Sequence, residues 1–507
     1  MKKIYNIWLI ALVFVFTVSC DSGFEELNTS KTGAISLDPA LILNNAVIFS
    51  SIPAGSLNYE LGIVQQVISS NTGVLEGANF NKNNSGNTVA NWVNYFQNTV
   101  KYANDVIVRT EEVPERSNLY NMARIVRANA FIVLTDTYGS VPYEEGGKGY
   151  TDQIFFPVYQ TQSAIYADII QTLKDATAAL NAGGKIETAD VLFAGNIDKW
   201  KKFGNSLLLR AGMRIAQADE TAAKAAIAAA LAGGLILTNA DNASIKHDAN
   251  YVNGVGNTLN GTEAANFYMA EPFVNALKTN NDPRLPAIAI RFVGATSGPA
   301  QVAAVATKVA ADQYGMPMGS TDAAADAAGG TLPGGGSRYA FSQVDRTRMV
   351  KRTSPMFLVT AAQTNLLLAE ARFKNYIATG DAQTYFTDGV KAHMDQMASF
   401  DPNSAVAAAD RDTYVSARVA TFAGNEVAQI NYEYWIASFL NGPEAWSNFR
   451  RSGFPALVGN PFSGRDVDFI FRLTYPPSEI LVNSVNVNEA IAEQGPDKLD
   501  TKLWWDK

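Results

Sequence analysis

The chain is poor in the residues that build disulfides and metal sites. Its 507 residues include one cysteine, Cys20, and two histidines, His247 and His393. A single cysteine excludes an intramolecular disulfide framework and a cysteine-based zinc site. Two histidines far apart in the sequence are more typical of packed or surface residues than of metal ligands. We therefore name no metal-ligating residue and expect no cofactor, while the sequence leaves a bound metal undecided.

Positive charge is scarce as well. Lys and Arg number 40 against 48 Asp and Glu, which gives a formal net charge of −8. This balance argues against a nucleic-acid-binding protein, because neutralising phosphates requires clustered Lys and Arg. The motifs of phosphate-binding loops, HExxH zinc enzymes, GxSxG hydrolases and EF-hands are missing from the sequence. No motif therefore supports catalysis, and an enzymatic function stays open at this point.

The N-terminus has the pattern of an export signal. Lys2 and Lys3 precede an apolar run over residues 7–18, which is too short to cross a hydrocarbon layer of ~30 Å as a helix. The segment resembles a bacterial lipoprotein signal, in which the cysteine after the run becomes the lipidated N-terminus. We expect a signal peptide over 1–19, lipidation of Cys20 and a tether over 20–40. The alternatives are an ordinary signal peptide with a chance cysteine, or a short membrane anchor.

Beyond the tether, the dominant hydrophobic period is helical. Apolar residues recur every three or four positions from Ile165 to Leu180, and Gly183-Gly184 is predicted to cap this helix in a left-handed conformation. Asp198 is the predicted N-cap of the next helix. Further helices are predicted over 41–54, 59–70, 90–112, 117–137, 222–234, 264–279, 355–378, 381–400 and 426–440. Strand signals are short, over 235–237, 287–293, 348–352 and 470–474. Residues 41–507 are therefore predicted to form one mostly helical domain.

Two long segments and one glycine stand out between these elements. Residues 71–91 and 312–340 are rich in Asn or Gly and are predicted to be loops, either functional or simple surface excursions. Gly139 follows the predicted helix 117–137, where we expect a backbone conformation that a side chain would hinder.

Several ordered motifs resemble the SusD/RagB-like outer-membrane nutrient-binding lipoproteins of Bacteroidota, in particular the second SusD-like group. They are LTDTYGSVPYEE (134–145), DKWKKFGNSLLLRAGMRIA (198–216), NDPRLP (281–286), QYGMPMG (313–319), LLLAEARFKNY (366–376), GPEAWSNFRRSGFPAL (442–457) and RLTYPPSEILVN (472–483). The resemblance implies an all-α fold of tetratricopeptide-like helix pairs with a loop-rich second half. It also implies a cell-surface lipoprotein that binds a nutrient, often a glycan, for a TonB-dependent (SusC-like) transporter, without catalysis.

Charged residues within the motifs favour structural roles. Glu370 lies between two alanines on an apolar helix, so we expect it to bond a buried Arg or Lys. Glu444 is likewise expected to pair with a basic residue while Trp446 packs inward. Arg284 is expected to bond nearby carbonyl or carboxylate groups. A glycosidase needs two carboxylates across a cleft, which the sequence can neither show nor exclude.

Aromatic residues in or beside loops are the candidates for ligand binding, because sugar rings stack on aromatic faces. We select Phe80, Trp92, Tyr251 and Tyr314, and we place the binding face near Phe80, Tyr251 and Tyr314. The leading hypothesis is a lipid-anchored outer-membrane protein that captures an oligomeric nutrient, which we expect to be a glycan, and delivers it to a TonB-dependent transporter. The alternatives are a lipid-anchored helical glycoside hydrolase and a helical-repeat scaffold lipoprotein.

Overall fold

The structure is a computed structural model that describes residues 37–71 and 77–506. The predicted signal peptide, Cys20 and most of the tether lie outside the described residues and stay predictions. The first helix, α3 (Pro39–Phe49), is capped by the carboxylate of Asp38, which accepts a hydrogen bond from the amide of Ala40 at 2.8 Å. This helix thus begins two residues earlier than the predicted helix over 41–54.

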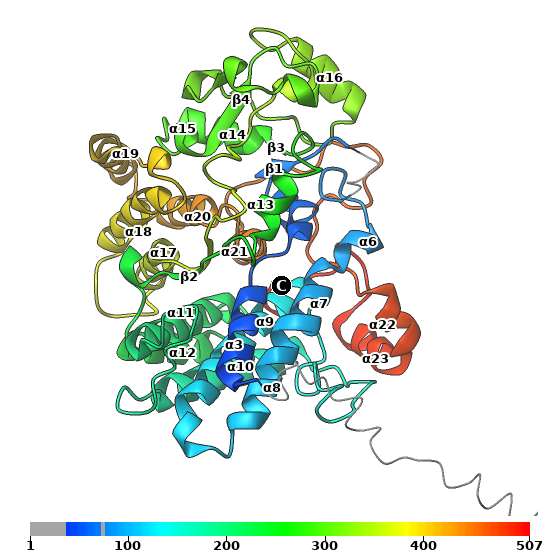
Figure 1. The fold of residues 1–507 in the computed structure, drawn as a ribbon. Helices are drawn as coiled ribbons and strands as arrows, with labels where there is room; N and C mark the ends of the chain where they lie inside the picture. Colours follow the sequence, from blue (N-terminus) through cyan, green and yellow to red (C-terminus); the bar gives the residue numbers. More distant parts are fainter. Residues whose placement is uncertain (1–36, 72–76, 507) are drawn as a thin grey trace, which may run out of the picture.

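Helices that follow one another in the chain pack side by side and make up most of the molecule (Figure 1). The first group comprises α3, α8 (Lys101–Thr110), α9 (Ser117–Tyr138), α10 (Gln162–Ala179), α11 (Ile197–Ile215) and α12 (Glu220–Gly233). The second comprises α17 (Ala361–Phe373), α18 (Ala382–Gln396), α19 (Ala408–Ala420), α20 (Glu426–Ala437) and α21 (Gly442–Ser452). Contacts of α11 with α17 and α21 join the two groups. The prediction of an all-α fold of helix pairs with a loop-rich part and a few short strands is confirmed.

The loop-rich part lies between these two groups in the sequence and forms one end of the molecule (Figure 1). Its helices are α13 (Gly254–Leu259), α14 (Glu271–Thr279), α15 (Leu285–Ile288) and α16 (Asp322–Gly330). Its largest sheet has the antiparallel order β5 (Ala306–Thr307), β4 (Ala289–Phe292) and β6 (Gln343–Val344). Two further antiparallel pairs join β1 (Val67–Ile68) to β3 (Tyr268–Met269), and β2 (Ala243–Ile245) to β7 (Met356–Val359). After α21 come α22 (Pro477–Val482) and α23 (Ser484–Gln494), which lie at one edge (Figure 1).

The end of α10 and the start of α11 differ from the predictions, because local capping contacts set where each helix ends or begins. The predicted cap at Gly183-Gly184 is wrong: α10 ends at Ala179, where Leu180 leaves the helix with φ −59° and ψ 130° and buries its side chain. The predicted N-cap at Asp198 is wrong too, because Asn196 accepts the hydrogen bond from the amide of Lys199 at 3.0 Å. The apolar faces themselves are confirmed, since the repeating positions of both helices are buried.

Most of the predicted strands do not form. Residues 289–292 are a strand, whereas 235–237, 348–352 and 470–474 are irregular. Single backbone hydrogen bonds hold the segment 470–474. The amides of Phe471 and Arg472 donate to the carbonyl of Leu499, and the amide of Leu473 donates to the carbonyl of Thr137. Short apolar runs therefore fill gaps between helices without building a sheet.

The two predicted loops contain short helices. The segment 312–340 holds α16, capped by Thr321, and buries Ala325 and Gly329 against the fold. The described part of 71–91 holds the four-residue helix α6 (Ser85–Thr88). The predicted helix over 90–112 is split into α7 (Ala90–Asn94), a π-helical turn over Tyr95–Val100, and α8.

One continuous hydrophobic core runs through both helical groups. A stretch within it, Pro39–Leu57, is long and apolar enough to cross a membrane by composition, but 56% of its apolar window is buried inside the fold, as in a core helix. At the end of α9, Gly139 has φ +84°, and a Cβ there would overlap Oε1 of Gln494. The conformational role predicted for this glycine is confirmed.

Candidate functional site

Two of the predicted aromatic residues are buried. Phe80 exposes 1% of its surface and packs on Phe462, with ring centroids 4.2 Å apart. Trp92 exposes 8% and packs between Phe96 and Tyr138 at 4.7 and 5.2 Å. Neither ring presents a face on which a sugar could stack in this structure, because burial in the core already uses its surface.

The other two predicted aromatic residues are more accessible but lie apart. Tyr314 is half-buried, and the cations of Lys278 and Arg291 lie 4.3 and 4.9 Å from its ring centroid. Tyr251 is 49% exposed on the loop before α13, where its carbonyl oxygen bonds Nδ1 of His247 at 2.8 Å. The loops of Phe80 and Tyr314 do adjoin, since Oδ1 of Asn79 accepts from the amide of Gly319.

Glu370 and Glu444, the two glutamates singled out in the motifs, form structural ion pairs. Glu370 is fully buried, and its two oxygens bond Arg451 at 2.6 and 2.8 Å and Lys374 at 2.8 Å. Burial by itself would raise the pKa of Glu370, but the charges and hydrogen bonds of Arg451 and Lys374 outweigh it and lower this pKa to about 2. The structural role predicted for Glu370 is confirmed.

Glu444 and Arg284 are also structural, as predicted. Glu444 bonds Arg214 at 2.7 Å and accepts a hydrogen bond from Tyr434 at 2.7 Å. Arg284, which is 1% exposed, bonds both Asp282 and Glu433 in the interior. These buried pairs tie α11 to α21 and the α14–α15 region to α20, so their loss would leave uncompensated charges.

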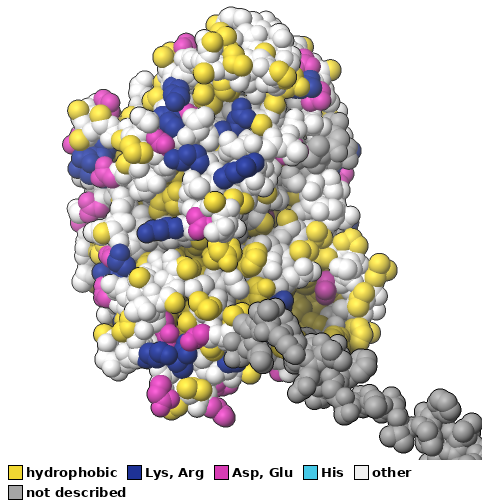
Figure 2. All heavy atoms as spheres, viewed as in Figure 1, with side chains coloured by type: hydrophobic (Ala, Val, Ile, Leu, Met, Phe, Trp, Pro, Cys, Tyr) yellow, Lys and Arg dark blue, Asp and Glu magenta, His cyan; other side chains and the backbone are white. Residues whose placement is uncertain are grey.

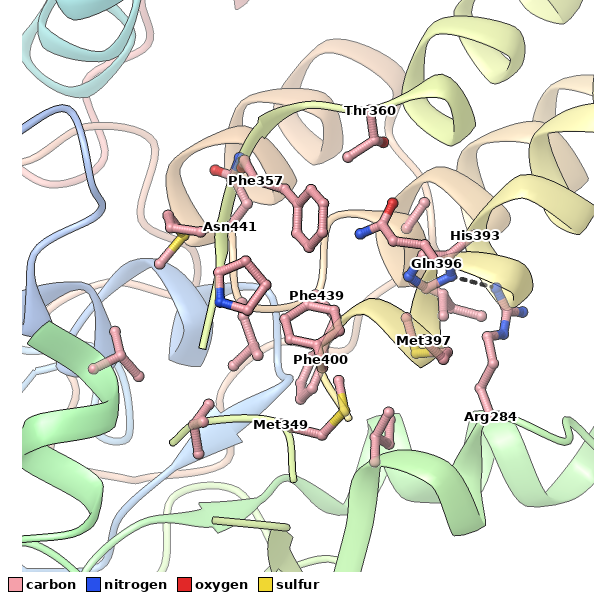
Figure 3. A pocket seen from close by; sticks show the side chains of 18 of the residues that line it. Arg284, Met349, Phe357, Thr360, His393, Gln396, Met397, Phe400, Phe439 and Asn441 are labelled. Atoms are coloured by element: carbon pink, nitrogen blue, oxygen red, sulfur yellow. Dashed lines mark hydrogen bonds between the residues drawn. The ribbon is translucent and has the colours of Figure 1, made fainter. Parts of the chain in front are cut away.

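Beside Arg284 lies a small interior cavity of about 30 Å³ (Figure 3). The rings of Phe357, Phe400 and Phe439 surround it, and Nη1 of Arg284 bonds Nδ1 of His393 at 2.9 Å at its border. Burial, followed by the nearby charge of Arg284, lowers the pKa of His393 well below its ordinary value, so this imidazole is neutral. The cavity has room for about one water molecule and none for a sugar ring.

An open cleft of about 790 Å³ lies on the sheet of the loop-rich part. We call it the β4 cleft. Ile290 and Phe292 alternate with Arg291 along β4, so both point to the cleft side, while Arg291 turns inward and donates to the carbonyl of Ala340 at 2.8 Å. The apolar residues of its walls are Ala303, Ala306 and Val309. The polar residues are Asn260, Gln301, Thr307, Lys308, Asp345, Arg346 and Thr347.

Two polar groups of the β4 cleft have no hydrogen-bond partner among the described residues. Within the described residues, the half-buried guanidinium of Arg346 makes no hydrogen bond or ion pair, and Oε1 of Gln301 is buried without a partner. Burial lowers the pKa of Arg346, against the opposing effects of Tyr268 and Asp345. Asp345, by contrast, is already paired with Arg348 at 2.6 Å and Lys308 at 3.2 Å. The cleft thus offers a strong donor above an apolar floor, and an unpaired acceptor that a ligand reaches once the Gln301 side chain turns outward.

A second open cleft of about 710 Å³ lies near Tyr251, between the loop before α11 and the β2–β7 pair. Its polar groups are largely used within the protein. Asp190 accepts hydrogen bonds from three backbone amides and from Nε1 of Trp200, and Asn242 accepts from the amide of Ala361. Unsatisfied groups attract ligands more strongly than satisfied ones, so the β4 cleft is the better candidate site.

Sequence reasoning missed the β4 cleft. Gln301 and Arg346 are 45 positions apart, and neither belongs to a recognisable sequence motif. They line the same cleft because β4 pairs with both β5 and β6. No group of three or more His, Cys, Asp or Glu side chains that could hold a metal occurs in residues 37–71 and 77–506.

Comparisons with known proteins identify one family and several solved structures to which this chain is similar. Residues 36–476 match the second SusD-like family, described as starch-binding and associating with the outer membrane. A solved structure described as a chitin-binding protein is 29% identical, with a TM-score of 0.81, and the match covers 93% of this chain and all of the other. A SusD-like protein of Bacteroidetes is 24% identical with the same TM-score and coverage. A chitin-binding SusD homolog from Flavobacterium johnsoniae is 22% identical, with a TM-score of 0.75, over 92% of this chain and 98% of its own.

A search of curated protein sequences finds no match. The family match covers most of the chain, and the solved structures share its fold over nearly its whole length. The family description names a binding role, starch binding, and an association with the outer membrane. The chain therefore belongs to the second SusD-like family of glycan-binding proteins associated with the outer membrane.

Proposed function

We propose that the protein captures an oligosaccharide bearing N-acetyl groups in the β4 cleft and delivers it to a TonB-dependent outer-membrane transporter. The observation that carries the ligand proposal is that one cleft is lined both by Arg346, whose guanidinium has no partner among the described residues, and by Gln301, whose Oε1 is buried without a partner. The chitin-binding relative at 29% identity supports this class of sugar.

The chemistry of an acetamido group fits these two side chains. Its carbonyl oxygen would accept from Arg346, its N–H would donate to Oε1 of Gln301, and its methyl group would contact Ile290 and Phe292. A sugar without the acetamido group would leave Gln301 unsatisfied. Rejection of such an analogue is the general consequence of a buried polar group that only the correct ligand pairs.

Isothermal titration calorimetry with chitohexaose and cellohexaose tests the ligand. We expect chitohexaose to bind and cellohexaose, which has hydroxyl groups in place of the acetamido groups, to bind at least tenfold more weakly. The substitution Arg346→Ala should weaken chitohexaose binding by about 10- to 100-fold, because a hydrogen bond to a charged group contributes ~1.5–3 kcal/mol. Arg124→Ala, at a half-buried arginine bonded to Asn121 on its own helix, is the control and should bind as the wild type does.

The same titration tests the aromatic residues predicted from the sequence. Tyr251 adjoins the second cleft through His247, so Tyr251→Ala should leave binding unchanged if the β4 cleft holds the sugar. A loss of affinity in Tyr251→Ala, with none in Arg346→Ala, would move the ligand to the second cleft. The roles assigned to Phe80, Trp92 and Tyr314 stay predictions.

Anchoring and delivery are separate parts of the proposal. Mass spectrometry of the mature N-terminus should find Cys20 as the first residue, carrying acyl chains that hold the protein at the cell surface. An intact Met1 would contradict this. Affinity purification from solubilised outer membranes should recover a TonB-dependent transporter, and a protein recovered alone would favour a scaffold lipoprotein instead.

A further inference from the structure

Large apolar side chains gather on one edge of the molecule, over α22, α23 and the loop that contains residues 155–158. We call six of them the apolar patch: Phe155, Phe156, Val158, Leu481, Val482 and Val485, with exposed fractions of 69, 61, 46, 79, 64 and 70%. Figure 2 shows hydrophobic side chains along the edge where Figure 1 places α22 and α23. Contiguous exposure of this kind is uncommon on soluble proteins unless another surface covers it.

The apolar patch is held in place by the protein's own hydrogen bonds. Asn486 donates to the carbonyl of Phe156 at 3.0 Å, and Asn483 donates to that of Pro157 at 2.8 Å. Tyr159 donates to Glu479 on α22 at 2.9 Å. The loop and the two helices therefore form one preformed surface, which lowers the entropy cost of binding a partner.

The patch residues do not support the protein's own core. On α23, Val487 and Ala490 face inward and are buried, whereas Val485 points to solvent. On α22 no side chain is buried, although the helix carries Ile480, Leu481 and Val482 in succession. Their apolar character thus serves something outside the described fold.

The two segments that carry the patch are acidic, and we call their charged residues its rim. Residues 144–158 contain Glu144, Glu145 and Asp152 against a single Lys148, and residues 477–494 contain three glutamates and no Lys or Arg. An acidic rim repels a second copy of the same surface and an anionic lipid surface alike. It is complementary to a protein surface that is apolar at its centre and basic at its rim.

We propose that the apolar patch is the surface through which this protein docks onto its transporter, and that the transporter presents an apolar contact edged by Lys and Arg. This inference rests on the proposed function, since it assigns a surface to the transporter partner. It places docking on α22, α23 and the 155–158 loop, whereas the β4 cleft lies in the loop-rich part at another end of the molecule (Figure 1).

The test is recovery of the transporter with tagged full-length protein from outer membranes. The patch variant combines Phe156→Ser, Leu481→Ser and Val485→Ser, and its control combines Val108→Ser, Leu237→Ser and Val458→Ser, which are 54, 45 and 74% exposed elsewhere. We expect the patch variant to lose about tenfold or more of the recovered transporter, because a few central side chains carry most of the binding energy of an interface and three of the six patch residues are changed. Chitohexaose affinity should be unchanged in both variants. Glu489→Lys, on the rim, should also reduce recovery.

The outcomes separate the two proposals. If the wild type recovers the transporter and the patch variant recovers as much, the docking surface is refuted while the proposed function stands. If the wild type recovers no transporter, the delivery function fails and the docking proposal fails with it. Binding of a Cys20→Ala protein to phosphatidylcholine vesicles, abolished by the patch substitutions, would identify a lipid surface as the occupant and overturn the proposal.

Discussion

Replacing Glu370 with glutamine tests whether the buried ion pairs hold the helical groups together. The carboxylate is fully buried on α17 and receives Arg451 of α21 and Lys374, and Asn431 of α20 also donates to it at 3.1 Å. Glutamine has nearly the same shape but no charge. Glu370→Gln therefore leaves the guanidinium of Arg451, which is 3% exposed, without its counter-ion in the interior.

Two estimates of the free energy of unfolding that Glu370→Gln removes agree. Removing one partner of a buried ion pair costs ~3–5 kcal/mol, because the remaining charge stays desolvated. The lowering of the pKa of Glu370 from its ordinary value of 4.5 to about 2 corresponds independently to ~3 kcal/mol of stability at neutral pH. A folded domain of this size unfolds with an entropy of about 1 kcal/mol/K, so the melting temperature should fall by ~3–5 °C.

Differential scanning calorimetry at two pH values checks both the size and the origin of this loss. Because the folded-state pKa is lowered, the carboxylate stabilises the wild type above pH 4.5, and this contribution disappears as pH falls towards 2. The difference between wild type and variant should therefore be full at pH 7 and shrink below pH 4.5. Glu112→Gln, at an exposed position, is the control and should not change the melting temperature. A change below 1 °C at pH 7, or a difference independent of pH, would refute the reasoning.

Two further predictions concern stability. Burial raises the pKa of Glu60 to about 7, so the folded state retains a proton that the unfolded chain loses near pH 4.5, and stability falls as pH rises between these values. The substitution Glu60→Gln can keep the hydrogen bond that Asn91 donates. It should raise the melting temperature by a few degrees at pH 8 and change it little at pH 4. Equal effects at both pH values would contradict this. Gly139→Ala should cost ~1–3 kcal/mol by urea unfolding, because alanine is strained at φ +84° and its Cβ would displace Gln494; Gly424→Ala, also at positive φ but with open space around it, should cost less.

Much of the scaffold could be predicted from local pattern. The spacing from Ile165 to Leu180 marks a buried helix face, and the buried position of Glu370 between alanines requires a cationic partner, both of which the structure confirms. Helix ends were less predictable. Asn196 and Asp198 are both good N-cap residues, and the choice between them depends on where the backbone leaves the helical conformation.

The ligand site could not be predicted in the same way. The aromatic residues chosen from the sequence have the right chemistry for sugars, but the side chains of Phe80 and Trp92 are buried in the core. Whether a ring or a guanidinium is available depends on what else has packed against it. Arg284, Arg291 and Arg346 look alike in the sequence, yet the first two are buried and bonded, while Arg346 faces an open cleft without a partner among the described residues.

The sequence by itself determined the helical class, the motif order that marks the family, and the structural use of its buried acids, because these follow from periodicity and from the cost of burying charge. Only the tertiary structure decided which polar groups stay unsatisfied. The pairing of β4 with β5 and β6 brings Gln301 and Arg346 into one cleft, and the bonds of Asn483 and Asn486 fix the loop of Phe155 and Phe156 beside α22. Both surfaces arise from contacts between residues distant in the chain, which no local pattern records.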